Sequence, residues 1–176
     1  MFFYGGGGAG RAPPPHAEAD VTGLVLSSTH LGFGRPKGEP LLPRYAARLD
    51  RLETKGVDAE FGLERAKRST PKGTSHEVVR FLADIAQDIR VEGIRDGGRM
   101  SQEADNAHVG QIASLPVLIL SGGKDRIISR DMHDALVAAF PRAQQVVFPD
   151  AGHASYAEFP RHFNAQIKEF ALNATK

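Results

Sequence analysis

Short apolar runs that alternate with helix-forming stretches are the feature of this sequence that most limits its fold. The last third shows the alternation most clearly, with apolar runs at 116–122 and 145–148 and helical patterns at 129–140 and 158–172. One further apolar run, Gly23–Ser28, stands near the start of the chain. Runs of this length separated by helices are typical of parallel strands joined by helical crossovers. The sequence therefore predicts an α/β fold built on a parallel sheet.

The middle of the chain has a different character. Residues 44–106 are rich in charged side chains and contain no strand-like run. Apolar positions from Val78 to Ile89 follow the i, i+3, i+4, i+7 spacing of an amphipathic helix, and Ser75 is placed to cap it. We expect two to four helices here, inserted into a core formed by 21–43 and 107–176.

Composition excludes several classes of function. The 176 residues contain no cysteine, which rules out a disulfide framework, a thiolate zinc site and a cysteine nucleophile. Basic and acidic side chains nearly balance, 22 against 21, so nothing favours a nucleic-acid or acidic membrane partner. No apolar run approaches the roughly 18 residues that span a bilayer, and the first residues do not follow a secretory signal pattern. We expect a small-molecule substrate and a cytoplasmic location.

No cofactor and no metal ion are expected. The string Gly5–Gly10 satisfies G-x-G-x-x-G, but that motif must open a helix, and the prolines at 13–15 follow it instead. The seven histidines show no metal-ligand spacing such as H-E-x-x-H. The sequence therefore gives no reason to look for a dinucleotide or a metal centre.

A carboxylate and an imidazole follow two of the predicted strands. Asp125 comes shortly after the run that ends at Leu120, and His153 comes shortly after the run that ends at Phe148. Because catalytic groups gather beyond the carboxyl ends of parallel strands, we expect both side chains at one edge of the sheet. An aspartate that accepts from a histidine Nδ1–H fixes its tautomer and stabilises the imidazolium, as a general base requires. On spacing alone, the favoured interpretation is a turn aspartate and a loop histidine without catalytic roles, because both are common.

Two further sets of residues deserve a test. His30 follows the end of the 23–28 run and could face a substrate, whereas the other five histidines are interpreted as surface or packing residues. Arg95 and Arg99 lie beside Met100 in the helical middle, where a cap would cover a site, but a solvated helix face is the simpler interpretation.

Residues 112–172 resemble the C-terminal segment of an α/β-hydrolase fold enzyme. The matching features, in chain order, are PVLILSGGKD, a helix that ends at Phe140–Pro141, the turn PDAGHA, Glu158–Phe159–Pro160 and a final helix. Residues 23–36 are similar to the strand that follows the nucleophile helix in these enzymes, and the helical middle resembles their cap. Among the subgroups, enol-lactonases and small-ester hydrolases are the most similar. The resemblance implies a partial α/β-hydrolase fold with Asp125 as the acid and His153 as the general base of a triad.

The nucleophile that this resemblance implies does not stand at the expected place. In these enzymes a serine on a G-x-S-x-G elbow precedes the acid and the histidine. Counting back roughly 19 residues from Gly23, one helix earlier, leads to Tyr4–Gly7, where there is no serine. The first serine of the chain is Ser27. We interpret 1–20 as a Gly- and Pro-rich lead-in, with at most a remnant of the elbow, and the N-terminal half of the fold as missing.

Two functions stay open on the sequence. The first is a serine-type hydrolase acting on a small ester, a lactone or a related carbonyl substrate. The second is a truncated, inactive chain that serves as a binding or interaction module. If the neighbouring strands are missing, the strand at 24–26 is expected to present an open apolar edge through which the chain self-associates or meets a partner.

Overall fold

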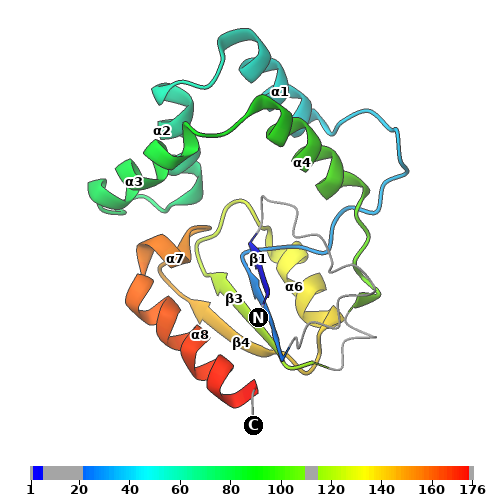
Figure 1. Ribbon diagram of the computed structural model, residues 1–176, viewed down its shortest axis with the longest axis vertical. Coiled ribbons are helices and arrows are strands. Elements are labelled where there is room, and N and C mark those ends of the chain that lie inside the picture. Colours follow the sequence, from blue (N-terminus) through cyan, green and yellow to red (C-terminus); the bar gives the residue numbers. More distant parts are fainter. Residues whose placement is uncertain (1, 6–21, 110–114, 175–176) are drawn as a thin grey trace.

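One parallel sheet organises the protein. The computed structural model describes residues 2–5, 22–109 and 115–174. Four strands pair in the order β1-β2-β3-β4, which is also their order in the chain, and every pair is parallel (Figure 1). Their bounds are Phe2–Gly5, Leu24–Ser27, Val117–Gly122 and Gln144–Phe148. The predicted α/β class with a parallel sheet is confirmed.

Helices cover both faces of the sheet. On one face α8 (Pro160–Ala174) packs Phe163 and Phe170 against Leu118 and Leu120 of β3. On the other face α6 (Arg130–Ala139) packs Leu136 against the neighbouring strand residues, Val117 and Ile119. Successive residues of a strand point to opposite faces, so an uninterrupted apolar run such as β3 can fill two cores at once. This explains why the strand has no polar alternation.

The last helix, expected at 158–172, begins slightly later in the structure. A short helix, α7 (Ser155–Glu158), is followed by a break at Phe159, and α8 begins at Pro160. Proline lacks a backbone N–H and fits the first turn of a helix better than its interior. The expected helix is therefore present as a single element, and Pro160 sets its start two residues later than expected.

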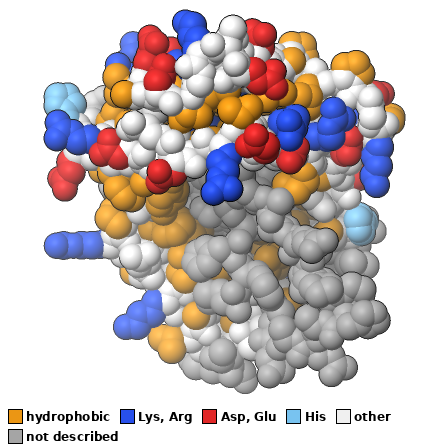
Figure 2. All heavy atoms as spheres, turned by 45° about the horizontal axis from the view of Figure 1, so that its top comes forward, with side chains coloured by type: hydrophobic (Ala, Val, Ile, Leu, Met, Phe, Trp, Pro, Cys, Tyr) orange, Lys and Arg blue, Asp and Glu red, His pale blue; other side chains and the backbone are white. Residues whose placement is uncertain are grey.

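Four helices form the middle of the chain and are called the insert below. They are α1 (Pro43–Lys55), α2 (Ala59–Ser69), α3 (His76–Ala86) and α4 (Val91–Glu103). Ser75 caps α3 as expected, because its hydroxyl accepts from the Val78 N–H. The insert lies beyond one end of the sheet (Figure 1), and lysine, arginine and acidic side chains intermingle over its outer surface (Figure 2). The four helices agree with the two to four that the sequence predicts for this part of the chain.

The structure corrects the expected open edge. The strand at 24–27 pairs on one side with β1 and on the other with β3, so it is an inner strand of the described sheet. Only residues 2–5 of the expected lead-in are described, and they form β1; residues 6–20, with the G-x-G-x-x-G string and His16, lie outside the described residues. Within the described ranges, no helix has the length and apolar character that crossing a membrane needs.

Candidate active site

The structure brings Asp125 and His153 together at the carboxyl edge of the sheet. His153 Nδ1 and Asp125 Oδ2 are 2.9 Å apart. The Asp125 side chain is 6% exposed and the His153 side chain 17%, so the contact is largely shielded from water. Asp125 follows β3 and His153 follows β4, as the strand ends predicted. Their catalytic roles belong to the proposal below.

The second oxygen of Asp125 is also bound. Its Oδ1 accepts from the Ile127 N–H at 2.7 Å and from the Ile128 N–H at 3.1 Å. With both oxygens accepting, the carboxylate cannot turn away from His153 without breaking backbone hydrogen bonds. A carboxylate accepts, so Nδ1 carries the hydrogen and Nε2 keeps its lone pair when the ring is neutral. The arrangement leaves Nε2 as the ring nitrogen that can accept a proton.

Backbone contacts between two loops hold the pair in place. The Gly123 N–H donates to the Phe148 carbonyl and the Lys124 N–H to the Ala151 carbonyl, both at 2.8 Å. A Cβ at Gly122 would overlap the carbonyl oxygens of Ala151 and Gly152. Glycine is therefore required at 122, because the loop that carries His153 passes directly over it. The sequence alone indicates only that the glycines at 122 and 123 allow a sharp turn after the strand.

One end of the insert is fixed to this edge. The His153 N–H donates to the Ser69 carbonyl at 2.8 Å, at the last residue of α2. Arg126, next to Asp125, donates from one nitrogen to the carbonyls of Lys67 and Thr70, both at 2.7 Å. A cation at the C-terminus of a helix satisfies unpaired carbonyls and complements the helix dipole. The end of α2 is thus held beside His153.

Glu158 supports the His153 loop, a role that the sequence did not indicate beyond the resemblance of its motif. Its Oε1 accepts from the Gly152 N–H at 2.9 Å, and its Oε2 is 3.5 Å from the Thr74 hydroxyl in the loop before α3. Burial raises the pKa of Glu158, opposed by these hydrogen bonds and reinforced weakly by the charge of Asp125. The sequence alone does not indicate that Glu158 accepts from Gly152 and Thr74.

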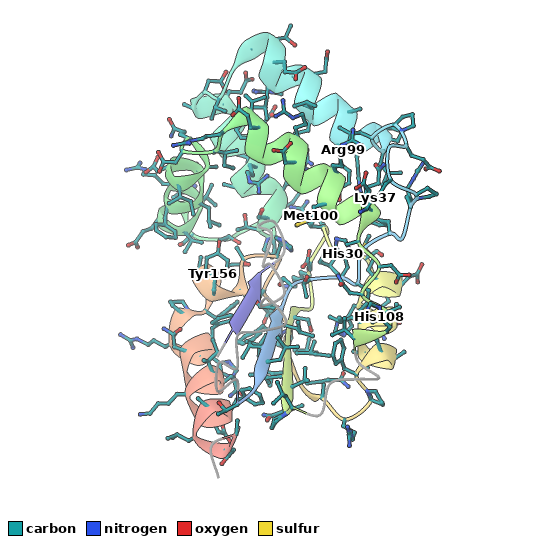
Figure 3. All side chains as sticks on the ribbon, turned by 45° about the vertical axis from the view of Figure 1, so that its right-hand side comes forward. His30, Lys37, Arg99, Met100, His108 and Tyr156 are labelled. Carbon is teal, nitrogen blue, oxygen red and sulfur yellow. The ribbon has the colours of Figure 1, made fainter. Side chains whose placement is uncertain are left out.

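His30 lies at the same edge, after β2. Its Nδ1 accepts from the Gly32 N–H at 2.9 Å, which leaves the hydrogen of the neutral ring on Nε2. Burial lowers the pKa of His30, and the charges of Arg44 and His153 lower it further. In Figure 3 Met100 projects from α4 into the same region between the insert and the sheet, close to His30. A neutral His30 would offer an Nε2–H donor there.

Arg95 and Arg99 have partners on their own helix. Arg95 pairs with Asp96 at 3.1 Å and Arg99 with Glu103 at 3.4 Å, and their side chains are 46% and 43% exposed. The simpler interpretation, a solvated helix face, fits these contacts. The structure does not bring the two arginines to Asp125 or His153 by any contact among the described residues.

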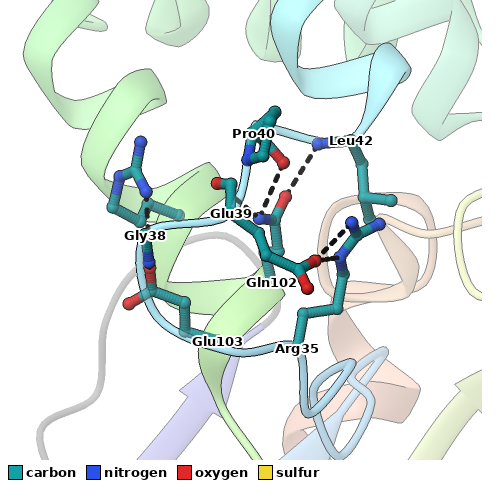
Figure 4. Close-up of polar contacts among 8 residues, drawn as sticks. Arg35, Gly38, Glu39, Pro40, Leu42, Gln102 and Glu103 are labelled. Atoms are coloured by element: carbon teal, nitrogen blue, oxygen red, sulfur yellow. Dashed lines mark hydrogen bonds and ion pairs between the residues drawn. The ribbon is translucent and has the colours of Figure 1, made fainter.

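Gln102 fixes the other end of the insert (Figure 4). This side chain of α4 is fully buried. Its Oε1 accepts from the Leu42 N–H at 2.7 Å, and its Nε2 donates to the carbonyls of Glu39 and Pro40 at 3.3 and 3.0 Å. The amide therefore joins the last helix of the insert to the segment that leads into its first helix.

No nucleophile is found among the residues that the structure describes. Ser27 and Ser28, at the carboxyl end of β2, are 8% and 7% exposed. Ser28 has a positive φ of 43°, and its Oγ is buried without a hydrogen-bond partner. Neither hydroxyl contacts His153 within the described ranges. The residues that follow β1 in the sequence, 6–10, contain glycine and alanine only and lie outside the described residues.

The comparison with known families identifies this architecture. The family described as alpha/beta hydrolase fold matches residues 31–160. The chain belongs to this alpha/beta hydrolase family. The resemblance seen in the sequence is therefore confirmed at the level of the superfamily.

Relatives of the alpha/beta hydrolase chain extend the match. The AB hydrolase superfamily protein YisY of Bacillus subtilis is 27% identical over 172 residues, which cover 97% of this chain and 64% of YisY. A thermophilic esterase from Thermogutta terrifontis has a similar fold, with a TM-score of 0.73 at 24% identity over 88% of this chain and 57% of the esterase. The enol-lactonase from Burkholderia xenovorans LB400 gives 0.70 at 20%, over 85% and 56%. The chain thus spans less than two thirds of each of these proteins.

Proposed function

We propose that this alpha/beta hydrolase chain cleaves a small ester, a lactone or a related carbonyl compound by serine-type acyl transfer. The observation that carries the proposal is the shielded 2.9 Å contact between His153 Nδ1 and Asp125 Oδ2 at the edge of the sheet. An oriented imidazole at this edge is the acid–base half of a triad. The esterase and enol-lactonase that share the fold support the substrate class.

In this proposal His153 is the general base and Asp125 orients it. Nε2 takes the proton of the attacking hydroxyl, and the Asp125 carboxylate stabilises the imidazolium that forms. The imidazolium then gives the proton to the leaving oxygen as the acyl–oxygen bond breaks. The insert, held at His153 and Arg126, acts as the cap that covers the substrate. Its proposed span is 44–106, between the core segments 21–43 and 107–176.

The origin of the hydroxyl is the open step of this proposal. By the resemblance, the nucleophile follows the strand that precedes 24–27, and β1 takes that place in the sheet. The sequence after β1 offers no serine before Ser27. This observation favours a second candidate function, in which the chain binds a small molecule or a partner at the same edge without turning it over.

An activity-based probe separates the two functions. The purified chain is incubated with p-nitrophenyl acetate and, separately, with a fluorophosphonate that labels activated serines. The variants are His153→Ala and, as a matched control, His108→Ala, because His108 is exposed and forms no hydrogen bond or ion pair with Asp125 or His153 among the described residues. If the first function holds, His153→Ala lowers turnover by about 10³-fold or more and abolishes labelling, whereas His108→Ala changes neither.

The negative result is also informative. A folded protein, shown by circular dichroism, that is neither labelled nor active would overturn the hydrolase proposal and leave the binding function. If labelling persists and depends on His153, mass spectrometry of the labelled peptide identifies the serine. Ser27 and Ser28 are the first positions to check, since they terminate β2.

Self-association and location complete the proposal. β1 is the outer strand of the described sheet on its side, and an outer strand has backbone groups that can pair with another chain. We expect association of purified chains by light scattering after size exclusion, and a monodisperse monomer would contradict it. A cytoplasmic location stays a prediction that cell fractionation tests.

A further inference from the structure

Four arginines of the insert form a cluster on two neighbouring helices. Arg44 and Arg48 belong to α1, and Arg65 and Arg68 belong to α2. Spacings of four and three residues place each pair on one face of its helix. The two helices are neighbours, since Arg51 of α1 lies over the Phe61 ring of α2, 5.4 Å from its centroid, and the charges of the other three arginines act on Arg48. These residues are called the arginine cluster below.

The arginine cluster has no acidic partner within the part of the chain that the structure describes. Ion pairing is available nearby, because Arg51 on α1 has Asp58, Glu60 and Glu64 within 3.4 to 3.7 Å. The cluster is not part of that network. Arg44 instead stacks over the rings of Phe33 and Tyr45, at 4.6 and 4.9 Å from their centroids. On the outer surface of the insert, by contrast, charges of both signs mix (Figure 2).

Burial makes this lack of partners unfavourable. Arg48 and Arg65 are half-buried. Burial, then Arg65 and Arg68, lower the pKa of Arg48 to about 10, and burial and Arg68 lower the pKa of Arg65. Both guanidinium groups stay charged at neutral pH. Desolvated cations without an anion cost free energy, and an oxyanion that enters the cluster would recover it.

The arginine cluster borders the candidate active site. Arg44 lies over the Phe33 ring, and the centroid of that ring is 4.8 Å from the centroid of the His30 ring. Arg65 lies on α2, whose last residue, Ser69, accepts from the His153 N–H at 2.8 Å. The charge of Arg65 also acts on Tyr156, which lies in α7 directly after the His153 loop. Figure 3 shows His30 and Tyr156 on the two sides of the region between the insert and the sheet edge. A ligand in this region could reach His153 and the cluster together.

We propose that the arginine cluster binds an oxyanion carried by the substrate, a carboxylate or a phosphate group, while the reactive carbonyl lies at His153. Guanidinium groups suit this task because their fork of N–H donors matches both oxyanions in bidentate geometry. The inference rests on the proposed function, and it narrows the substrate from any small ester to an anionic one. It also assigns to the insert the recognition of charge.

Binding measurements test the inference without requiring turnover. Isothermal titration compares monomethyl succinate, which is a methyl ester with a carboxylate, with dimethyl succinate, which is its neutral counterpart. We expect the anionic ester to bind about tenfold more tightly or better at low salt. Methyl 3-phosphonopropionate replaces the carboxylate by a phosphonate and reports which oxyanion the cluster prefers.

Matched variants locate the binding. Arg48→Gln combined with Arg65→Gln should abolish the preference for the anionic ester and leave the affinity for dimethyl succinate unchanged. Arg80→Gln removes a charge from an exposed position of α3 and should leave the preference intact. Arg48→Lys keeps the charge without the fork and should bind the anion with intermediate affinity.

The outcomes separate this inference from the proposed function. Equal affinity of the wild-type protein for the two esters overturns the inference, even if His153-dependent turnover is found. A preference that Arg80→Gln reduces as much as the double variant overturns it too, because the effect is then one of net charge. A preference confined to the cluster supports it, even if the fluorophosphonate test fails. Should the double variant not fold, the comparison of the two esters on the wild-type protein still decides.

Discussion

The Asp125–His153 pair lies at the carboxyl edge of the sheet and the arginine cluster lies in the insert beyond it, and the two differ in how their charges are satisfied. Both oxygens of Asp125 accept hydrogen bonds from groups of this chain, and His153 is held by its backbone as well as its ring. Among the described residues, the side chains of the arginine cluster form no ion pair, and Arg44 lies over two aromatic rings. The pair is therefore complete before any ligand arrives, whereas the cluster gains its partner by binding.

This difference separates two kinds of polar group in one site. Groups that are fully hydrogen-bonded in the folded chain position other groups and support its stability. Charged groups that are desolvated without a partner reduce the stability of the folded chain, and a ligand of opposite charge that pairs with them removes this cost. In the two proposals, the pair serves the chemistry and the cluster serves selection of the substrate.

The largest effect is expected from breaking the pair. Asp125→Asn keeps an oxygen for the Ile127 and Ile128 N–H groups but can present an NH₂ group to Nδ1, which would force the hydrogen of the ring onto Nε2. The base is lost while the loop survives. We expect turnover of p-nitrophenyl acetate to fall by about 10³- to 10⁴-fold, with little change in melting temperature. Asp150→Asn is the matched control, because Asp150 is exposed and pairs with Lys124 on the surface.

Asp125→Ala sharpens the same test. This variant leaves the Ile127 and Ile128 N–H groups without their acceptor, so it should lose about 1–3 kcal/mol of stability in addition to activity. Denaturant unfolding measures the loss. If Asp125→Asn retained turnover while Asp150→Asn did not, the assignment of Asp125 as the orienting acid would be wrong.

The second prediction concerns Gln102, whose side chain, like the Asp125 carboxylate, is buried and hydrogen-bonded through both of its polar atoms. Gln102→Ala removes the acceptor of the Leu42 N–H and the donor for the carbonyls of Glu39 and Pro40. Because the side chain is fully buried, we expect a loss of about 2–3 kcal/mol in the free energy of unfolding. The exposed Gln87→Ala should cost less than about 0.5 kcal/mol. Equal costs for the two variants would show that the Gln102 contacts do not hold the insert.

The parts of the fold that the sequence predicted are those with strong local signals. β2, β3, β4 and α6 follow from apolar runs and caps within one or two residues of their observed bounds. The juxtaposition of Asp125 and His153 follows from the rule on strand ends. The break between α7 and α8 required attention to Pro160, since apolar periodicity continues across it. The pairing of β1 with β2 depends on tertiary contact, which the short run before the glycines did not reveal.

The arginine cluster could not be predicted for a related reason. Arg95 and Arg99 are candidate site residues on the sequence because they are four residues apart on one helix. In the structure each pairs with an acidic side chain of α4. The four clustered arginines come from two helices. Their significance depends on how α1 faces α2 and on which acidic side chains lie elsewhere, and neither is encoded in local spacing. Only the folded arrangement shows which cations have no anion.

A smaller change in the free energy of unfolding, a gain where Gln102→Ala gives a loss, is expected from a substitution in the arginine cluster. Arg48→Gln removes a half-buried cation from the neighbourhood of three others, so the ligand-free protein should gain about 0.5–1 kcal/mol of stability. Arg80→Gln on the exposed face of α3 should leave the stability within about 0.5 kcal/mol. Denaturant unfolding at low salt measures both. Destabilisation by Arg48→Gln would show that this arginine has a structural partner and would remove the contrast with the Asp125–His153 pair.

The smallest effect is expected at Glu158, a carboxylate that shares features of both groups. It is hydrogen-bonded to the Gly152 N–H, yet burial raises its pKa above the ordinary value of 4.5. The folded state then binds more protons than the unfolded state in a window that begins near pH 4.5 and extends upward. In that window the contribution of this group to stability falls as the pH rises, and it is lost once the pH exceeds the folded pKa.

Glu158→Gln isolates this contribution because glutamine cannot ionise and still offers an oxygen to the Gly152 N–H. Denaturant unfolding at several pH values from 4 to about 7 should show a steeper rise with pH in the variant than in the wild-type protein. Glu77→Gln, at an exposed position in the first turn of α3, is the control for the loss of one carboxylate. Parallel curves for Glu158→Gln and the wild-type protein would mean that burial does not disfavour the charged form of Glu158. The Gly152 hydrogen bond would then fully offset burial, and Glu158 would belong with the satisfied groups of the Asp125–His153 pair.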